Sequence, residues 1–181
     1  MNILSQNNSI VLIIDLQEKL VNMLEKDIIS EKVSKLVKAA NILNIPVIAT
    51  EQYPAGLGKT VLSVRENFND KTTVFEKVTF SALDTDGLRG KLKSYGKKQV
   101  VLCGIETHIC VHQTCSALLD EGYEVYVIKD ACASRNKYEF KQGIDLMTQN
   151  GAKISCLEIA LFEWLKTAKH PDFKTIQALI K

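Results

Sequence analysis

The chain has 181 residues, of which 23 are basic and 21 acidic, giving a formal net charge of +2. This even balance excludes nucleic acid and anionic membranes as the main partners, because both select strongly basic surfaces. The length fits a single domain, residues 1–181, with a sizeable hydrophobic core. Hydrophobic residues make up 46% of the chain and charged residues 24%, a balance typical of soluble globular proteins.

The N-terminal stretch and the cysteines together indicate a reducing compartment. The opening residues, MNILSQNNSIVLIIDLQ, lack the basic start and the small-residue cleavage site of a secretory signal. No apolar run approaches the roughly 20 residues that a membrane-spanning helix needs. We therefore expect a cytoplasmic protein whose five cysteines are free thiols.

The first half of the chain alternates apolar strands with an amphipathic helix. Residues 9–16 form a continuous β-branched run that is typical of a buried strand. Residues 31–43 repeat apolar side chains at helical spacing, and Ser30 is placed to act as the N-cap. Further strands are predicted at 46–50 and at 72–77.

The second half continues the same alternation. The predicted elements are a helix at 88–96 that ends at a glycine, a strand at 99–104, a helix at 108–122, a strand at 124–130, a helix at 136–149, a strand at 152–156, and helices at 157–166 and 171–181. This order predicts an α/β fold: a three-layer α/β/α arrangement around a mostly parallel, six-stranded, Rossmann-like sheet.

Reactive side chains follow the predicted strands. In a parallel sheet, ligands bind beyond the carboxyl ends of the strands, near the point where the strand order reverses. Asp15 ends the first strand, Gln52 follows the second, Lys77 ends the third and Asp130 ends the fifth. We expect Asp130 to tie down its loop through Arg135 rather than to take part in catalysis.

The segment 101–115, VLCGIETHICVHQTC, contains three cysteines and two histidines. A zinc site is disfavoured, because Cys110 lies two residues from both His108 and His112 and no C-x-x-C pair occurs. The same spacing disfavours a Cys–His dyad, because helical neighbours two apart do not face each other. Two interpretations of Cys110 stay open. It is either a nucleophile in the first turn of a helix, where backbone N–H groups favour a thiolate and an oxyanion, or a small buried hydrophobe.

Four short stretches carry a family resemblance: IIDLQ at 13–17, FEKVTFSAL at 75–83, CGIETHICV at 103–111 and DACASR at 130–135. Together, and in this order, they resemble the isochorismatase-like cysteine hydrolases, a superfamily that includes nicotinamidases and N-carbamoylsarcosine amidases. The resemblance spans nearly the whole chain. Two more stretches, TEQYPAGLGKT at 50–60 and HPDFKTIQALIK at 170–181, resemble the isochorismatase domain-containing subgroup.

The resemblance implies a catalytic triad of Asp15, Lys77 and Cys110. Cys110 would attack a carbonyl carbon, Asp15 would take up the thiol proton, and Lys77 would keep the carboxylate and the thiolate ionised. A cis peptide between Ile105 and Glu106 is implied as well, together with an oxyanion hole made by the backbone N–H groups of Glu106 and Cys110. Water would then cleave the thioester.

The resemblance and its departures also bear on substrate and cofactors. Gln17, Gln52, Tyr53 and Phe80 follow strand ends, and we expect them to line the substrate pocket. The Asp-x-His metal motif of nicotinamidases has no counterpart here, so neither a metal nor another cofactor is expected. True isochorismatases lack the cysteine, and Cys110 therefore argues against isochorismate. The expected partners are a small-molecule substrate and, because relatives form homo-oligomers, further copies of the chain.

Two functions remain for the sequence. The leading one is a metal-independent cysteine hydrolase that cleaves a C–N bond in a small amide-type substrate through a thioester intermediate. The alternative is a noncatalytic or redox-responsive binding protein on the same scaffold, which the five thiols motivate. A sensor would form a reversible sulfenic acid or disulfide with peroxide, whereas the hydrolase needs one nucleophilic thiol.

Overall fold

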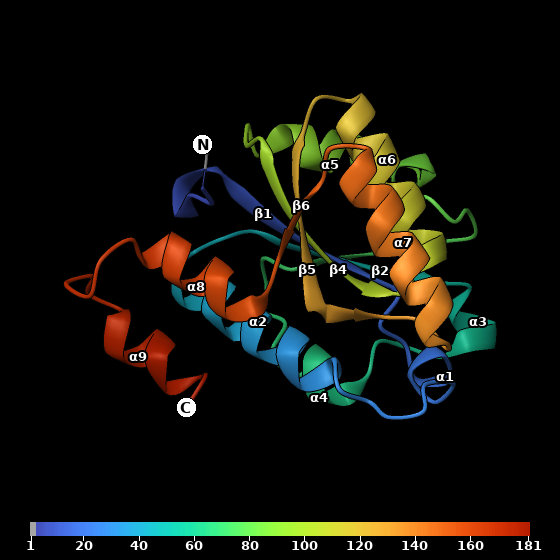
Figure 1. Cartoon of the computed structure of the whole chain (residues 1–181), viewed down its shortest axis with the longest axis horizontal. Coiled ribbons are helices and arrows are strands. Elements are labelled where there is room, and N and C mark those ends of the chain that lie inside the picture. The colour runs from blue at the N-terminus through green and yellow to red at the C-terminus, as the bar shows by residue number, and fades with distance from the viewer. Residues whose placement is uncertain (1–2) are drawn as a thin grey trace.

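The core of the protein is a six-stranded sheet with helices on both faces (Figure 1). The computed structural model describes residues 3–181. Its strands are all parallel and lie in the order β3-β2-β1-β4-β5-β6, so the predicted Rossmann-like fold class is confirmed. The strands are β1 (Ser9–Ile14), β2 (Val47–Gln52), β3 (Thr73–Lys77), β4 (Gln99–Ile105), β5 (Glu124–Ala133) and β6 (Lys153–Ser155).

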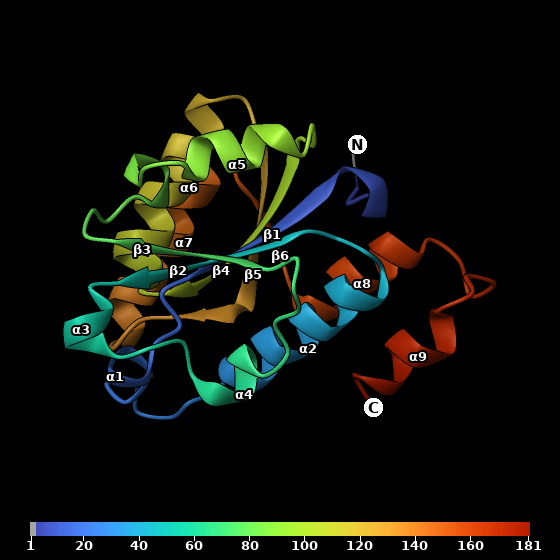
Figure 2. The same ribbon diagram turned by 180° about the vertical axis from the view of Figure 1, so that it is seen from behind.

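Two groups of helices cover the sheet, and short helices stand at its carboxyl end (Figures 1 and 2). One face carries α5 (Leu88–Ser94), α6 (His112–Asp120) and α7 (Lys137–Gln149), and the other carries α2 (Ser30–Ile42), α4 (Leu62–Arg65), α8 (Leu157–Leu165) and α9 (Phe173–Ala178). At the carboxyl end lie α1 (Glu18–Val21) and α3 (Pro54–Leu57). Within residues 3–181, none of the helices has the length and apolar character needed to span a bilayer.

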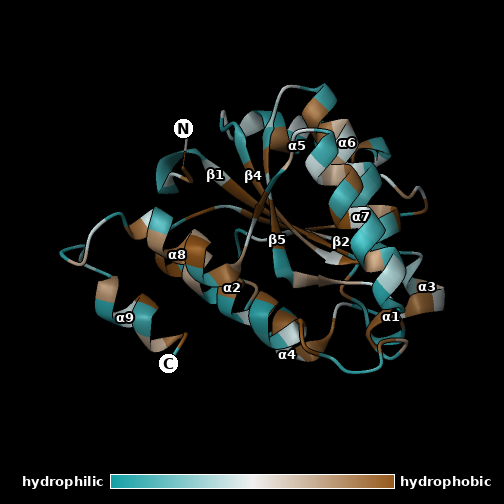
Figure 3. Ribbon diagram, viewed as in Figure 1, coloured by the Kyte–Doolittle hydropathy of each residue, from teal (hydrophilic) through white to brown (hydrophobic). Residues whose placement is uncertain are grey.

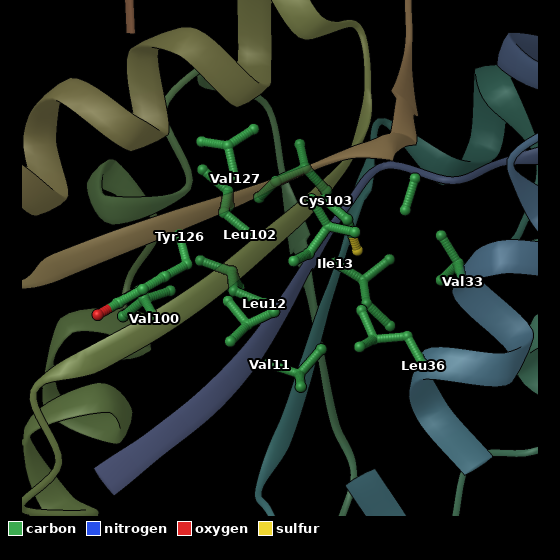
Figure 4. Packing of buried hydrophobic residues seen from close by; sticks show 14 of the residues in the cluster. Val11, Leu12, Ile13, Val33, Leu36, Val100, Leu102, Cys103, Tyr126 and Val127 are labelled. Carbon is green, nitrogen blue, oxygen red and sulfur yellow. The ribbon is translucent and has the colours of Figure 1, made fainter. Parts of the chain in front are cut away.

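The two central strands are buried along their whole length. Every residue of β1 and of β4 is inaccessible to solvent or nearly so, because helices cover both faces of the sheet. On one face, Val11 and Ile13 of β1 point toward Val33 and Leu36 of α2 (Figure 4). The outer surfaces of α2 and α7 are mixed or hydrophilic (Figure 3). The apolar run that predicted the first strand is therefore explained by burial on two sides.

Strand β5 is longer than predicted, because it continues to Ala133 past a shift in its pairing with β4. Asp130 consequently lies inside the strand rather than at its end. Its carboxylate accepts a hydrogen bond from the backbone N–H of Leu157, at 2.9 Å, where α8 begins. The expected contact with Arg135 is wrong: the ion-pair partner of Asp130 is Lys32, at 3.5 Å.

The start of α2 also differs from the prediction. Ser30 is the first residue of the helix and not its cap. The carboxylate of Asp27 instead accepts hydrogen bonds from the backbone N–H groups of Ile29 and Ser30, at 3.2 and 3.0 Å. A capping side chain three residues before the helix was not visible in the apolar periodicity, which marks only the buried face.

Candidate functional site

The candidate site lies where the order of the strands reverses. Strands β1 and β4 are neighbours, and from this pair the chain runs outward to β2 and β3 on one side and to β5 and β6 on the other. Asp15 directly follows β1, and a turn containing Cys110 follows β4. Because parallel strands end at the same edge of a sheet, both groups lie at the position where such folds bind ligands.

Asp15 is buried and fixed by the neighbouring strand. Its side chain has no exposed surface, and its backbone has a φ of 47°, a left-handed conformation that Asp tolerates better than most residues. Its backbone N–H donates to the carbonyl oxygen of Thr50 at 3.1 Å. The Thr50 hydroxyl donates to Oδ1 at 2.7 Å, which leaves Oδ2 directed at other groups.

Lys77 reaches the same point from the edge of the sheet. It ends β3, two strands away from β1, and strand spacing makes that a gap of about 10 Å that a long side chain can cross. Its Nζ lies 2.7 Å from Asp15 Oδ2, in a fully buried ion pair. It donates hydrogen bonds to Gln52 Oε1 at 2.6 Å and to the carbonyl oxygens of Thr79 and Phe80 at 3.0 and 3.2 Å.

Cys110 lies in a wide turn that precedes a helix. The prediction that a regular helix begins near residue 108 is wrong, because residues Thr107–Val111 form a π turn and α6 begins at His112. The backbone N–H of Val111 donates to the carbonyl oxygen of Glu106 at 3.2 Å, which closes this wider ring. Cys110 is buried, with 8% of the residue exposed to solvent.

Gly104 allows β4 to approach β1 at the site. Its φ is 125°, and a Cβ atom at this position would lie 2.0 Å from the backbone oxygen of Ile14. Only glycine fits such a contact. The next peptide bond but one, between Ile105 and Glu106, is cis, as the family resemblance implied.

Burial is the largest cause of the pKa shifts of Asp15 and Cys110, and the charges of neighbouring side chains come second. Burial raises the pKa of Asp15 above its usual value, although the Lys77 ammonium opposes that shift. Burial, followed by the nearby Asp15 carboxylate, raises the pKa of Cys110 to about 12, again against the effect of Lys77. Burial therefore opposes the thiolate that the resemblance implied, and the raised pKa of Cys110 favours a thiol beside Asp15.

Three of the other four thiols are no better suited to redox chemistry. Cys103, Cys115 and Cys132 are buried, and burial raises the pKa of Cys115 and that of Cys132 to about 12 and the pKa of Cys103 well above its usual range. Sensor cysteines are accessible and have a low pKa. Cys156 is partly exposed.

Two of the predicted pocket residues have structural hydrogen bonds. The Gln17 side chain is fully buried, and its amide N–H₂ donates to the carbonyl oxygens of Gln52 and Gly58 at 3.0 and 2.6 Å. Its amide oxygen accepts from the Gln52 N–H at 2.7 Å. The Gln52 side chain in turn holds Lys77. For both glutamines, contact with a substrate stays a prediction.

A cavity of about 680 Å³ adjoins the site at Lys77. Tyr53, which has a left-handed backbone with a φ of 37°, lines it together with Phe75 and Val78. Lys77 is among the residues that line this cavity, whereas Asp15 and Cys110 are not. Phe80, three residues after the end of β3, is 54% exposed. In the part of the chain that the structure describes, no cluster of three or more His, Cys, Asp or Glu side chains could hold a metal ion.

Sequence reasoning missed Thr50, which fixes Asp15, and the loop carbonyl groups that hold Lys77. Thr50 left one signal, because it is the polar residue that follows the apolar run PVIA at 46–49. The carbonyl oxygens of Thr79 and Phe80 left none, because backbone groups are the same in every sequence. Only the path of the loop shows that they point at the ammonium.

Comparison with known proteins gives consistent matches. The profile of the isochorismatase domain matches residues 9–159. The secreted isochorismatase effector Isc1 of Phytophthora sojae is 37% identical over 97% of this chain and 85% of its own length. Isochorismatase domain-containing protein 2 of Danio rerio is 37% identical over 98% and 89%.

Solved structures share the whole fold. The MAR1 ribonuclease of Caenorhabditis elegans superposes with a TM-score of 0.94 at 36% identity, covering 99% of this chain and 92% of its own. YcaC of Pseudomonas aeruginosa, in a structure with covalent acrylamide, has a TM-score of 0.92 at 25% identity, covering 99% and 90%. YcaC of Escherichia coli, described as an octameric hydrolase of unknown specificity, has a TM-score of 0.88 at 24% identity, covering 98% and 96%.

Proposed function

The chain belongs to the isochorismatase family, and we propose that it hydrolyses a C–N bond in a small amide-type substrate with Cys110 as the nucleophile. The observation that carries this proposal is the meeting of three groups from separate strands. The Asp15–Lys77 ion pair measures 2.7 Å, and the Cys110 thiol interacts with both of its members. A nucleophile, a base and a cation are the parts that such a hydrolysis needs.

The reaction follows from the protonation of these groups. As Sγ of Cys110 bonds to the carbonyl carbon, the thiol proton passes to Oδ2 of Asp15. The backbone N–H groups of Glu106 and Cys110 stabilise the resulting oxyanion, each donor lowering the barrier by about 3–4 kcal/mol. When the C–N bond breaks, the proton on Asp15 moves to the leaving nitrogen, and ammonia or an amine departs. Asp15 then deprotonates a water molecule as its oxygen attacks the thioester carbon. The C–S bond breaks, the acid product departs, and the proton on Asp15 returns to the Cys110 sulfur.

The proposed reaction uses no metal or other cofactor. Lys77 supplies the positive charge next to the base. Its side chain is fully buried, and its ammonium group contacts oxygen atoms of Asp15, Gln52, Thr79 and Phe80. The proton acceptor is Asp15 and the attacking atom is a protein sulfur, so each role in the sequence of steps is assigned to the chain itself.

A ribonuclease activity is a second possibility to test, because one similar structure is named a ribonuclease. The net charge of +2 gives it little support, since RNA binding depends on neutralising phosphates with Lys and Arg. A buried thiol beside a carboxylate is suited to acyl transfer rather than to attack on a phosphate. RNA therefore belongs in the assay as a comparison substrate.

The proposed function is tested by offering the protein a panel of small amides, ureas and a short RNA. We expect ammonia release from at least one amide, and a covalent acyl adduct on Cys110 in the mass spectrum. Cys110→Ala is expected to lose both signals. Cys115→Ala is the matched control, because it removes a thiol whose pKa is also about 12, and it keeps both. Hydrolysis by Cys110→Ala, or cleavage of RNA alone, would overturn the proposal.

We also propose that the chain self-associates through the edge strand β3, which Figure 2 shows at the border of the sheet. Apolar side chains are exposed there, with Val78 77% exposed and Val74 and Phe80 close to half. Val78→Glu is expected to reduce the mass measured by light scattering to that of one chain. Leu62→Glu, at a site on α4 that is 61% exposed, should leave the mass unchanged. If the unaltered protein already had the mass of one chain, the proposed self-association would be contradicted.

A reducing compartment, such as the cytoplasm, remains part of the proposal. All five cysteines are free thiols, and four of them are buried. Buried unpaired thiols are common where disulfides do not form. One relative is named a secreted effector, so the location is best tested by fractionating the cells that make this protein.

A further inference from the structure

The turn that carries Cys110 lacks the regular support of a helix. Its hydrogen bonds close wider rings than those of an α-helix, and such turns occur mostly as short insertions at functional sites. The positions of the Cys110 sulfur and of the nearby N–H groups therefore depend on what packs against the turn. An error of 1 Å in such groups can reduce the rate of a reaction about 100-fold.

Helix α7 contacts the backbone of this turn directly. Gly143 is the contact point, because a Cβ atom there would lie 2.9 Å from both His108 Cα and the carbonyl oxygen of Thr107. Gly143 is buried in the middle of α7, where alanine would otherwise be preferred by roughly 1 kcal/mol. Its small size is therefore needed for the close approach of α7 to the turn.

The side chain of His108 joins the same two elements. Its Nδ1 lies 2.9 Å from the hydroxyl of Ser134, just beyond β5. Its Nε2 lies 3.6 Å from Glu139 Oε2, on the face of α7 that also carries Gly143 four residues later. Glu139 Oε2 is buried and has no hydrogen-bond partner among the described residues. The ion pair that it forms is with the His108 imidazole.

A second contact ties the start of the turn to the same region. The Glu106 carboxylate accepts a hydrogen bond from the backbone N–H of Arg135 at 3.1 Å and pairs with the Arg135 guanidinium at 3.3 Å. Glu106 and His108 lie two residues apart on either side of Thr107. Both are held by the segment that connects β5 to α7.

We propose that His108 is a positioning residue for Cys110, acting with Ser134, Glu139 and Gly143 as a latch that fixes the turn against α7. This inference rests on the proposed function, because the latch matters only where the turn holds a nucleophile. Nδ1 is within hydrogen-bond distance of the Ser134 hydroxyl, and the tautomer of the ring decides which of the two groups donates. His108 touches neither Asp15 nor Lys77 in any contact found, and it acts through the geometry of the turn.

The test compares two electrophiles that react with the Cys110 thiol. Addition to acrylamide places negative charge on a carbonyl oxygen, whereas displacement of iodide from iodoacetamide does not. We expect His108→Ala to slow the acrylamide adduct at Cys110 by about 10- to 100-fold, and the iodoacetamide adduct by less than threefold. His108→Asn, which keeps a polar atom near Nδ1, should restore most of the rate. Intact-protein mass spectrometry measures both adducts.

Matched variants separate positioning from general loss of structure. Ser134→Ala should slow acrylamide addition as His108→Ala does, and the double variant should be no slower, because both break one contact. Gly143→Ala should also slow it, whereas Gly90→Ala, in α5 with open space around its Cβ position, should not. Equal slowing of both electrophiles, or no rescue by His108→Asn, would overturn the latch.

The result also separates the latch from the proposed function. On a substrate that the protein hydrolyses, His108→Ala should lower kcat while KM changes less than threefold. If no amide is hydrolysed but acrylamide addition still depends on His108, the proposed function fails and the latch stands. If amides are hydrolysed and His108→Ala leaves both kcat and the adduct rate unchanged, the latch fails and the function stands.

Discussion

Lys77→Met is expected to destabilise the protein by about 3–5 kcal/mol, because it removes one member of a fully buried ion pair. The Asp15 carboxylate would remain in the core without its cation. The oxygen atoms of Gln52, Thr79 and Phe80 would also lose their donor. Hydrolysis by the folded fraction should fall at least 100-fold, because loss of the ammonium raises the pKa of Asp15 and leaves less of the carboxylate form to accept the Cys110 proton.

The pH dependence of this loss isolates the part due to Asp15. Lys77 lowers the pKa of Asp15, so its removal raises that pKa further above the usual 3.8. A raised folded-state pKa means that the unfolded chain releases the proton first as pH rises. The extra destabilisation is therefore absent below the pKa of Asp15 in the unaltered folded protein, which itself lies above 3.8. It grows as pH rises past that pKa and is complete above the further raised pKa of Asp15 in the variant.

Urea unfolding of Lys77→Met between pH 4.5 and 8 measures this trend. We expect the variant to approach the unaltered protein in stability toward the acid end. Lys77→Met combined with Asp15→Asn should be more stable at pH 8 than the sum of the single changes predicts, because no charge is then left buried. A loss that is independent of pH and additive would show that the pair contributes packing alone.

The sequence predicted the sheet because its signals are local and strong. The β-branched run at 9–16 and the strand at 99–104 are buried on both faces, and that burial produced the continuous apolar pattern. Acidic, basic and sulfur-containing residues at strand ends could then be assigned to one edge. That argument placed Asp15, Lys77 and the segment carrying Cys110 at one edge, and the family resemblance then selected these three residues as a set.

The sequence could not predict how the site is held. Residues 108–122 have helical periodicity, yet the first turn is a π turn that packs against α7, a contact distant in sequence that periodicity does not report. The same limit hid the role of Thr50. Burial of Cys110 was not visible in the sequence either: it raises the pKa of the thiol, and the opposing effect of Lys77 is smaller.

Asp15→Asn is expected to have opposite effects on two reactions of the same thiol. Asparagine tolerates the left-handed backbone at this position, so the variant should fold. Hydrolysis should fall about 100- to 10,000-fold, because an amide cannot accept the Cys110 proton. The Asp15 carboxylate raises the pKa of Cys110, so its removal lowers that pKa and increases the thiolate fraction.

Alkylation by iodoacetamide should therefore become faster in Asp15→Asn, by roughly threefold for each unit that the pKa of Cys110 falls, since a less basic thiolate is also a weaker nucleophile. In the unaltered protein the alkylation rate should rise with pH up to pH 10 without levelling, because the pKa of Cys110 is about 12. Mass spectrometry of the Cys110 adduct follows both. If alkylation slows together with hydrolysis, the proton already resides on Asp15 in the resting protein, and the thiol is activated before substrate arrives rather than during attack.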